Sequence, residues 1–381
     1  MGSSVNGLLP AHIASGWVFR VPVRDAHRKE HPLRSVMKLA SLTLVGAVAL
    51  AACSSSSTPS SSTGSSPSPS KSSVKVGLAY DIGGRGDKSF NDSAGAGLDK
   101  AVTDLGIEKK ELSAVAGETE SQRVARLTVL AVGGYNPVIA VGFNYASAVK
   151  TVATKFPKVN FAIIDDSSNL QANVANLTFA ANEGSYLAGV LAASASKTGK
   201  VGFIGGVNVG LLQSFQVGFD AGAKATNPSI VVTDKYLTQP PDFRGFNAPD
   251  LGKVTAQGMY DQGVDVIYAA AGGSGLGVFQ AAKASGKLAI GVDSDQYLSA
   301  SADLQPVILS SALKHVDNAV YAFIKSAVDG AVLTGVQTFN LKNDGVGLAT
   351  SNSASAPFQA AVDAAAAKIK DGSIVVPNKL P

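Results

Sequence analysis

Short apolar runs alternate with segments of helical period along the chain from residue 74 onward. The run VKVGLAY at 74–80 is typical of a buried strand, and apolar side chains recur at spacings of three and four over 90–105. Gly106 ends this predicted helix. Two further strand-like runs, KVGFIGG at 200–206 and DVIYAAA at 265–271, also precede helical segments. Alternation of this kind predicts parallel β-α-β units in an α/β fold.

The strand-helix alternation occurs in two similar series of β-α units. The segments that follow them along the chain are expected to cross between the two units of the fold. Because roughly 308 residues are too many for one small core, we expect two domains. We predict two Rossmann-like lobes with parallel sheets, joined by a hinge of several strands. The first lobe is expected to hold residues 74–180 plus 308–342, and the second residues 181–307 plus 343–381. Hinges of this kind close two lobes over a ligand held in the cleft between them.

The residues before the first predicted strand are typical of a targeting signal followed by a linker. A basic start at Met37, an apolar centre and small residues before Cys53 indicate a secretory signal. We expect residues 1–52 to be this leader, and we favour Met37 as the true start of the chain. The sequence LAAC, ending at Cys53, resembles a bacterial lipobox, which implies cleavage before Cys53 and lipidation of its thiol. Residues 53–73 hold this cysteine and a Ser- and Pro-rich linker with no residues for a core.

The formal net charge of +4 belongs to the leader. Residues 1–52 hold six of the 32 Lys and Arg and two of the 28 Asp and Glu, so the rest of the chain is balanced. A balanced domain gives no electrostatic reason to expect nucleic acid as a partner. Cys53 is the only cysteine, which excludes an internal disulfide or a multi-cysteine metal site.

Polar clusters follow several of the predicted strands, at the edge where ligands bind in open parallel sheets. We expect all of them to face one cleft. An oxygen-only Ca²⁺ or Mg²⁺ site stays open as an interpretation, but no His or Cys lies near these carboxylates, and we assign no metal. For Asp166 and Asp295, a role as plain surface carboxylates is the alternative. The clusters are Asp81 with Asp87, Asp165 with Asp166, the glycine turn at 272–277, and Asp293 with Asp295.

The sequence lacks the usual combinations of catalytic residues. A Ser-His-Asp hydrolase would have to use His315, the one histidine after the leader, but the chain has no G-x-S-x-G motif for the nucleophile. The chain also has no Walker loop for a nucleoside triphosphate. The glycines of DIGGRGDKSFN at 81–91 do not follow G-x-G-x-x-G, so a dinucleotide site is not indicated. We therefore predict a binding protein that is not an enzyme and has no cofactor.

Seven motifs stand between residue 74 and about residue 330: DIGGRGDKSFN, GFNYASAV, FAIID, NEGSYLAGVLAA, VGFIGG, GVDVIYAAAGGSGLGVFQAAK and AIGVDSDQ. In this order they resemble the basic membrane protein family, the PnrA-like group of nucleoside-binding lipoproteins that serve ABC transporters. The resemblance implies a type I solute-binding fold with a purine nucleoside between its lobes. It implies a permease and an ATPase as partners, and a position outside the cytoplasm with the lipid as the only membrane anchor. A monomer is the simplest expectation for such a tethered receptor.

The resemblance also implies which residues contact the ligand. Asp87 and Asp165 are expected to bond the base, and Asp293 and Lys314 the ribose. Asn91, in the same motif as Asp87, is a further expected ligand contact. Such charge-assisted hydrogen bonds contribute about 1.5–3 kcal/mol each in a dry cleft. The remaining expected contacts are backbone groups of Gly272, Gly273 and Ser274 near the sugar, and the ring of Phe246 stacked on the base.

Two positions depart from the family pattern. Gly95 stands where an aromatic residue usually stacks on the base, and Gly86 stands where Asn is usual. Base–aromatic stacking contributes about 1–3 kcal/mol in nucleic-acid complexes, so the loss is substantial unless another ring replaces it. Because Gly95 weakens the case for base stacking, the same fold binding a sugar or another small polar ligand is the nearest alternative. An extracytoplasmic nucleoside hydrolase and a signalling or wall-associated protein without a transport role also stay open. Candidates for a replacement ring are Phe90, Phe143, Phe215 and Phe243.

Overall fold

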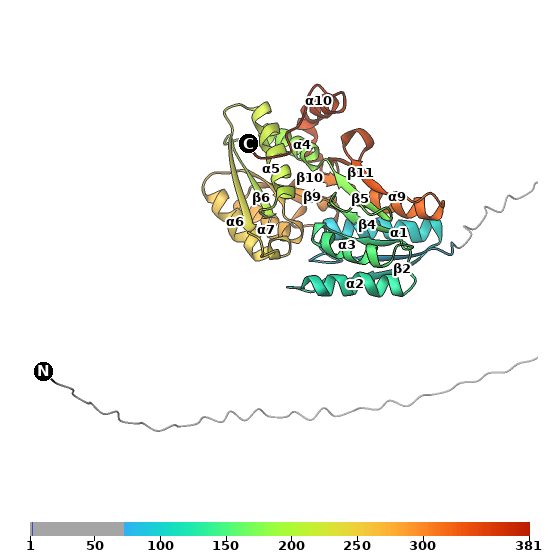
Figure 1. The fold of residues 1–381 in the computed structure, drawn as a ribbon. Coiled ribbons are helices and arrows are strands. Elements are labelled where there is room, and N and C mark those ends of the chain that lie inside the picture. The colour runs from blue at the N-terminus through green and yellow to red at the C-terminus, as the bar shows by residue number, and fades with distance from the viewer. Residues whose placement is uncertain (1, 3–71) are drawn as a thin grey trace, which may run out of the picture. The chain divides into compact units, whose positions relative to one another are not determined.

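The computed structural model describes Gly2 and residues 72–381. The predicted leader, Cys53 and most of the predicted linker lie outside these residues, so their assignments stay predictions. The described part contains two six-stranded sheets, each with helices packed on both faces (Figure 1). Among the described residues, no helix combines the length and the apolar character needed to cross a membrane.

The first lobe is built on the sheet β11-β5-β4-β3-β1-β2, in which every pairing is parallel. Helices α1 and α9 cover one face of this sheet, and α2 and α3 cover the other. The elements are β1 (Lys75–Ala79), α1 (Phe90–Leu105), β2 (Glu108–Leu112), α2 (Glu120–Val132), β3 (Val138–Ala140), η1 (Phe143–Tyr145), α3 (Ala146–Lys155), β4 (Phe161–Ile164), β5 (Val174–Phe179), α9 (Val316–Val328) and β11 (Gly335–Phe339). The short helix η5 (Leu341–Asn343) follows β11, and its Leu341 packs into the core of the second lobe.

The second lobe repeats this plan in the sheet β12-β10-β9-β8-β6-β7, where only β12 runs antiparallel to its neighbour. Helices α4 and α5 cover one face, and α6 and α7 the other. The elements are α4 (Ala181–Ala195), β6 (Lys200–Val207), α5 (Gly210–Thr226), β7 (Val231–Thr238), η2 (Arg244–Phe246), α6 (Pro249–Asp261), β8 (Val266–Ala270), η3 (Gly272–Ser274), α7 (Gly275–Ser285), β9 (Leu288–Asp293), α8 (Gln296–Ser299), η4 (Gln305–Val307), β10 (Ile308–Lys314), β12 (Val346–Leu348), η6 (Ser353–Phe358) and α10 (Gln359–Lys370).

The first helix shows how local sequence sets the elements. The predicted helix over 90–105 is α1, and Gly106 ends it in the left-handed region, with φ 65°. The N–H of Gly106 donates to the carbonyl oxygen of Val102. Glycine adopts this conformation without the steric cost that a Cβ atom brings, which is why it ends so many helices.

The predicted two-lobed α/β fold is confirmed, but one lobe boundary differs from our expectation. We placed 308–342 in the first lobe, whereas β10 pairs with β9 and β12 in the second sheet. The chain crosses to the first lobe only after Lys314, at the start of α9. The apolar pattern of β10 predicts a strand but does not show which sheet the strand extends.

Glycines bring α4 and α5 into backbone contact in the second lobe. A Cβ atom on Gly222 would lie 2.0 Å from the carbonyl oxygen of Tyr186, and one on Gly189 would lie 2.1 Å from that of Phe219. Both partners are backbone atoms of the facing helix, so they cannot swing away as a flexible side chain does. The distance between the two helices therefore depends on these positions carrying no side chain.

Replacing Gly222 by Ala is expected to lower the free energy of unfolding by about 1–3 kcal/mol, because the new methyl group forces the helices apart. Guanidinium unfolding measures this change. Gly210→Ala, on the same helix, is the matched control, since a Cβ there meets no atom within 4 Å. The control should not destabilise the fold by more than about 0.5 kcal/mol. Equal losses in the two variants would contradict the close contact.

Candidate functional site

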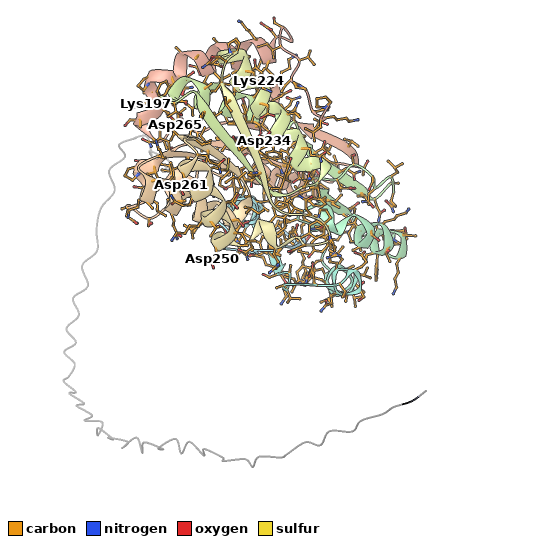
Figure 2. The ribbon with its side chains drawn as sticks, turned by 90° about the vertical axis from the view of Figure 1, so that its left-hand side faces the viewer. Lys197, Lys224, Asp234, Asp250, Asp261 and Asp265 are labelled. Carbon is orange, nitrogen blue, oxygen red and sulfur yellow. The ribbon has the colours of Figure 1, made fainter. Side chains whose placement is uncertain are left out.

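A cleft lies between the lobes, where strands of both sheets end. Its volume is about 570 Å³, counted with its open mouth. The charged residues labelled in Figure 2 belong to the second lobe, and none of them lines the cleft. Its polar lining is Asp81, Asp87, Asn91, Asp165, Asp293 and Lys314, and the rest is Ile82, Phe90, Gly142, Phe143, Leu211, Leu212, Phe215, Phe246, Ala270, Gly272 and Val292.

Asp165 and Asp293 occupy equivalent places in the two lobes. Asp165 directly follows β4 and Asp293 ends β9, and these strands hold the same position in the order of the two sheets. Both residues have a left-handed backbone, with φ 65° and 63°. This conformation is uncommon for residues other than glycine and often marks a ligand site. The repeated fold thus places one carboxylate from each lobe in the cleft.

Lys314, at the end of β10, forms an ion pair with Asp165 across the two lobes. Each side chain is only 4% exposed. The rings of Phe90, Phe179 and Phe215 surround the ammonium group, with centroids 4.6, 5.2 and 5.7 Å from it. This arrangement allows cation–π attraction as well as ion pairing. The second oxygen of Asp165, Oδ1, is buried without a partner among the described residues. That oxygen is an acceptor that a ligand can satisfy.

Asp87 has a structural task in addition to the predicted ligand contact. Its two oxygens accept the backbone N–H groups of Ser89, Asn91 and Asp92 at 2.9, 2.9 and 3.1 Å, and the side-chain amide of Asn91 at 2.9 Å. The three backbone donors are N–H groups at the start of α1, which have no partner within the helix. The Oδ1 of Asn91 in turn accepts the backbone N–H of Asp81 at 3.0 Å. Asp87 and Asn91 therefore fix the loop from β1 to α1, and both also line the cleft.

Burial shifts Asp81, Asp87 and Asp293 towards their neutral forms by raising their pKa values. It raises the pKa of Asp293 to about 6, although the charge of Lys314 and the hydrogen bond from Ser89 oppose the shift. Burial also raises the pKa of Asp81 to about 6 and raises that of Asp87. A ligand that donates hydrogen bonds to these carboxylates favours their ionised forms and so reverses the shift.

Aromatic rings from both lobes meet in the cleft. The ring of Phe143, in the first lobe, lies edge-on to Phe246 and Phe243 of the second, with centroids 6.5 and 6.1 Å apart. The predicted Phe246 therefore lines the cleft together with Phe143. Gly95 does not line it, because a Cβ there would lie 2.3 Å from Cζ of Arg85. The guanidinium group of Arg85 fills the space beside Gly95.

The glycine turn contributes less than expected. Gly272 lines the cleft, but Gly273 and Ser274 are not among the lining residues. The hydroxyl of Ser274 donates to the carbonyl oxygen of Gly245 at 2.7 Å and accepts the N–H of Ala248 at 2.7 Å. Ser274 therefore joins η3 to the loop before α6, and its hydroxyl is committed to that task.

The ends of the predicted strands mark where the cleft lies, but side chains at these ends point both into the cleft and away from it. We expected Asp166 and Asp295 to face the cleft, but neither lines it. Asp166 accepts hydrogen bonds from Ser168 and Asn169, and Asp295 accepts one from Ser351 at 2.5 Å. Within residues 72–381, no group of three or more His, Cys, Asp or Glu is placed to hold a metal ion. The lining residues that we did not single out, such as Ile82, Gly142 and Leu211, also follow strands, so the same signal was available for them.

Replacing Asp293 by Asn is expected to stabilise the chain at pH 7.5. A carboxyl group whose pKa rises from 3.8 to about 6 on folding stabilises the fold while it is protonated, and that contribution is lost as the pH rises through 6. The loss amounts to about 3 kcal/mol for a shift of this size. Thermal unfolding at pH 7.5 and pH 4.5 should show a gain for the variant that shrinks at the lower pH. The control is Asp261→Asn, on the exposed side of α6 (Figure 2), and a gain independent of pH would contradict the prediction.

Comparisons with known proteins place this geometry in a family. The model of PnrA-like ABC transporter substrate-binding proteins matches residues 74–379. The "ABC transporter nucleoside-binding protein BmpA" of Lactococcus lactis is 34% identical over 361 residues, which cover 91% of this chain and 99% of that protein. "Basic membrane protein D" of Borreliella burgdorferi is 38% identical over 286 residues, which cover 73% of this chain and 80% of that protein.

Solved structures agree with the fold. An ABC transporter solute-binding protein from Aeropyrum pernix superposes with a TM-score of 0.70 at 27% identity, over 80% of this chain and 94% of that one. One from Conexibacter woesei gives a TM-score of 0.67 at 26% identity, over 80% and 99% of the two chains. The fold is therefore the type I solute-binding fold that the motifs predicted, and the chain belongs to the family of PnrA-like ABC transporter substrate-binding proteins.

Proposed function

We propose that this solute-binding protein captures a nucleoside, preferentially a purine nucleoside, in the cleft and delivers it to an ABC importer. The observation that carries the proposal is the combination of facing aromatic rings with four buried carboxylates, of which Asp165 keeps one oxygen without a donor among the described residues. A nucleobase offers a flat apolar face and N–H groups at its edge. A ribose offers paired hydroxyl groups. One nucleoside therefore supplies partners for both parts of the lining.

The base is assigned to the aromatic side of the cleft. Phe143 and Phe246 come from different lobes, and their ring centroids lie 6.5 Å apart. A planar ligand that enters here would contact both rings as the lobes close over it. Phe143 thus replaces the stacking residue that the family pattern places at Gly95. In this proposal Asp87 and Asn91, beside these rings, remain candidates for contact with the base edge.

The sugar is assigned to Asp293, with Gly272 nearby on the same lobe. An ionised carboxylate accepts two vicinal hydroxyl groups, and the pKa of about 6 leaves Asp293 ionised at neutral pH. The ion pair of Lys314 with Asp165 changes the roles that the resemblance implied for these two residues. We propose that they meet the ligand together, with Lys314 donating and Oδ1 of Asp165 accepting, and do not serve opposite ends of it.

Two further points support the assignment. The Lactococcus relative carries "nucleoside-binding" in its name and aligns over nearly its whole length. The lipobox-like LAAC and the Ser-rich linker support an extracytoplasmic position, with the chain anchored by a lipid on Cys53 and the domain held away from the membrane. A monomer remains the simplest expectation.

Isothermal titration of the purified chain with adenosine, guanosine, inosine, cytidine, uridine, adenine and ribose tests the ligand class. Heat is expected with purine nucleosides. Their 5′-monophosphates should bind at least 100-fold more weakly, because the phosphate would face four carboxylates and one lysine that is already paired. Heat with ribose alone would support the sugar alternative. Recovery of free base after incubation would support the hydrolase, and no heat with any nucleoside would remove the proposal.

Replacing Asp293 by Ala is expected to weaken purine nucleoside binding at least tenfold while the fold is kept, because the ribose hydroxyls lose their charged acceptor. Titration gives the affinity, and circular dichroism checks the fold. Asp166→Ala is the matched control. That carboxylate also follows a strand of the sheet, β4, but it accepts hydrogen bonds from Ser168 and is not among the residues that line the cleft. Unchanged affinity in Asp293→Ala would take Asp293 out of the site.

A further inference from the structure

Ser89, in the DKSFN motif, makes a hydrogen bond between the lobes that no ligand contact explains. Its side chain is fully buried and is not part of the cleft lining. The hydroxyl oxygen lies 2.6 Å from Oδ2 of Asp293 and 3.2 Å from the carbonyl oxygen of Val292. Both of these acceptors belong to β9 of the second lobe, so the single hydroxyl proton of Ser89 is donated across the lobe boundary.

The second lobe returns hydrogen bonds to the same stretch. The hydroxyl of Ser294 donates to the carbonyl oxygen of Ser89 at 2.9 Å, and the side-chain amide of Gln296 donates to that of Lys88 at 3.0 Å. The amide oxygen of Gln296 is itself held by the N–H of Val292 at 2.9 Å. Two consecutive residues of the first lobe are thus bonded to one turn of the second.

The serine is held rigidly from its own side. Its backbone N–H donates to Oδ1 of Asp87 at 2.9 Å, and its carbonyl oxygen also accepts the N–H of Ser93 at 3.0 Å. Lys88, just before it, has a left-handed backbone with φ 56°. The start of α1 therefore presents the hydroxyl in a fixed direction, and the orientation of Asp293 is set by a group from the other lobe.

We infer that Ser89 is a latch: it joins the lobes in the closed state and positions the carboxylate of Asp293 for the ligand. The bond exists only when the lobes meet, because in an open protein water would solvate both groups. It is a charge-assisted bond and belongs to the stronger class. The part of this inference that concerns affinity rests on the proposed function, whereas the part that concerns closure does not.

The latch has a distinct signature in binding. By stabilising the closed state, such a residue raises the affinity for every ligand by the same factor, because it changes the closed population. By positioning Asp293, it acts in addition on those ligands that bond to that carboxylate. The effect falls on dissociation, because the lobes must part before the ligand leaves. A residue that only supports the fold would change thermal stability without changing the distance between the lobes.

The test measures the lobe distance directly. In the full chain with Cys53→Ser, we would introduce cysteines at the exposed positions Lys150 on α3 and Gln280 on α7, attach spin labels and record distance distributions with and without inosine. Ser89→Ala should lower the closed population and raise the dissociation rate of inosine roughly tenfold. Ser89→Thr keeps the hydroxyl and should recover part of both effects.

Ser93→Ala is the matched control, because this buried serine of α1 bonds to the N–H of Asp317 inside the first lobe, at 3.1 Å. It should leave the distance distribution unchanged. If Ser89→Ala matches this control, the latch is wrong. If Ser89→Ala does not fold, Ser294→Ala removes the reciprocal bond from a less buried position, and an unchanged distribution there would equally overturn the inference. If inosine does not bind, the proposed function is in question, while the distances without ligand still decide the latch.

Discussion

The buried ion pair of Lys314 and Asp165 is the contact on which the closed arrangement depends. The two residues lie at the ends of strands in different sheets, Asp165 after β4 and Lys314 at the end of β10. Each side chain is only 4% exposed. A charge withdrawn from water is tolerated when a partner compensates it, and removing one partner is far more costly than never having the pair. The charge of Lys314 also acts on Asp293 of its own lobe, but the direct ion pair forms only between the lobes. It forms because the doubly wound topology brings the ends of β4 and β10 to the same cleft.

This pair also sets the electrostatic character of the cleft. With the lysine committed to Asp165, the carboxylates of Asp81, Asp87 and Asp293 have no second cation in the lining. Burial raises their pKa values, which means that the folded chain disfavours their charges. A neutral ligand rich in N–H and O–H donors relieves this cost, whereas an anionic ligand adds to it. Under the proposed function, this lining therefore favours a neutral ligand with N–H and O–H donors.

The sequence was enough to predict the two lobes and the location of the cleft, because strand ends and helix starts are local signals. Seven of the nine expected site residues line the cleft, among them Phe246 and Lys314. What the sequence did not show was how each side chain is shared between ligand and fold. The carboxylate of Asp87 accepts four donors of α1, and the hydroxyl of Ser274 is committed to a loop, and neither fact follows from residue type or spacing. The lobe assignment of β10 failed for a related reason, since partner strands are chosen by tertiary packing.

Under the proposed function, the repeated fold couples closure to ligand binding at the level of single atoms. Asp165 and Asp293 stand at equivalent strand ends, and each is engaged by a group of the opposite lobe, Asp165 by Lys314 and Asp293 by Ser89. Each lobe therefore holds a cleft carboxylate that is bonded to a group of the other lobe. In such an arrangement an open protein has not merely a wider cleft but less well oriented acceptors. The ligand and the interlobe bonds then stabilise the same state, so their contributions reinforce one another.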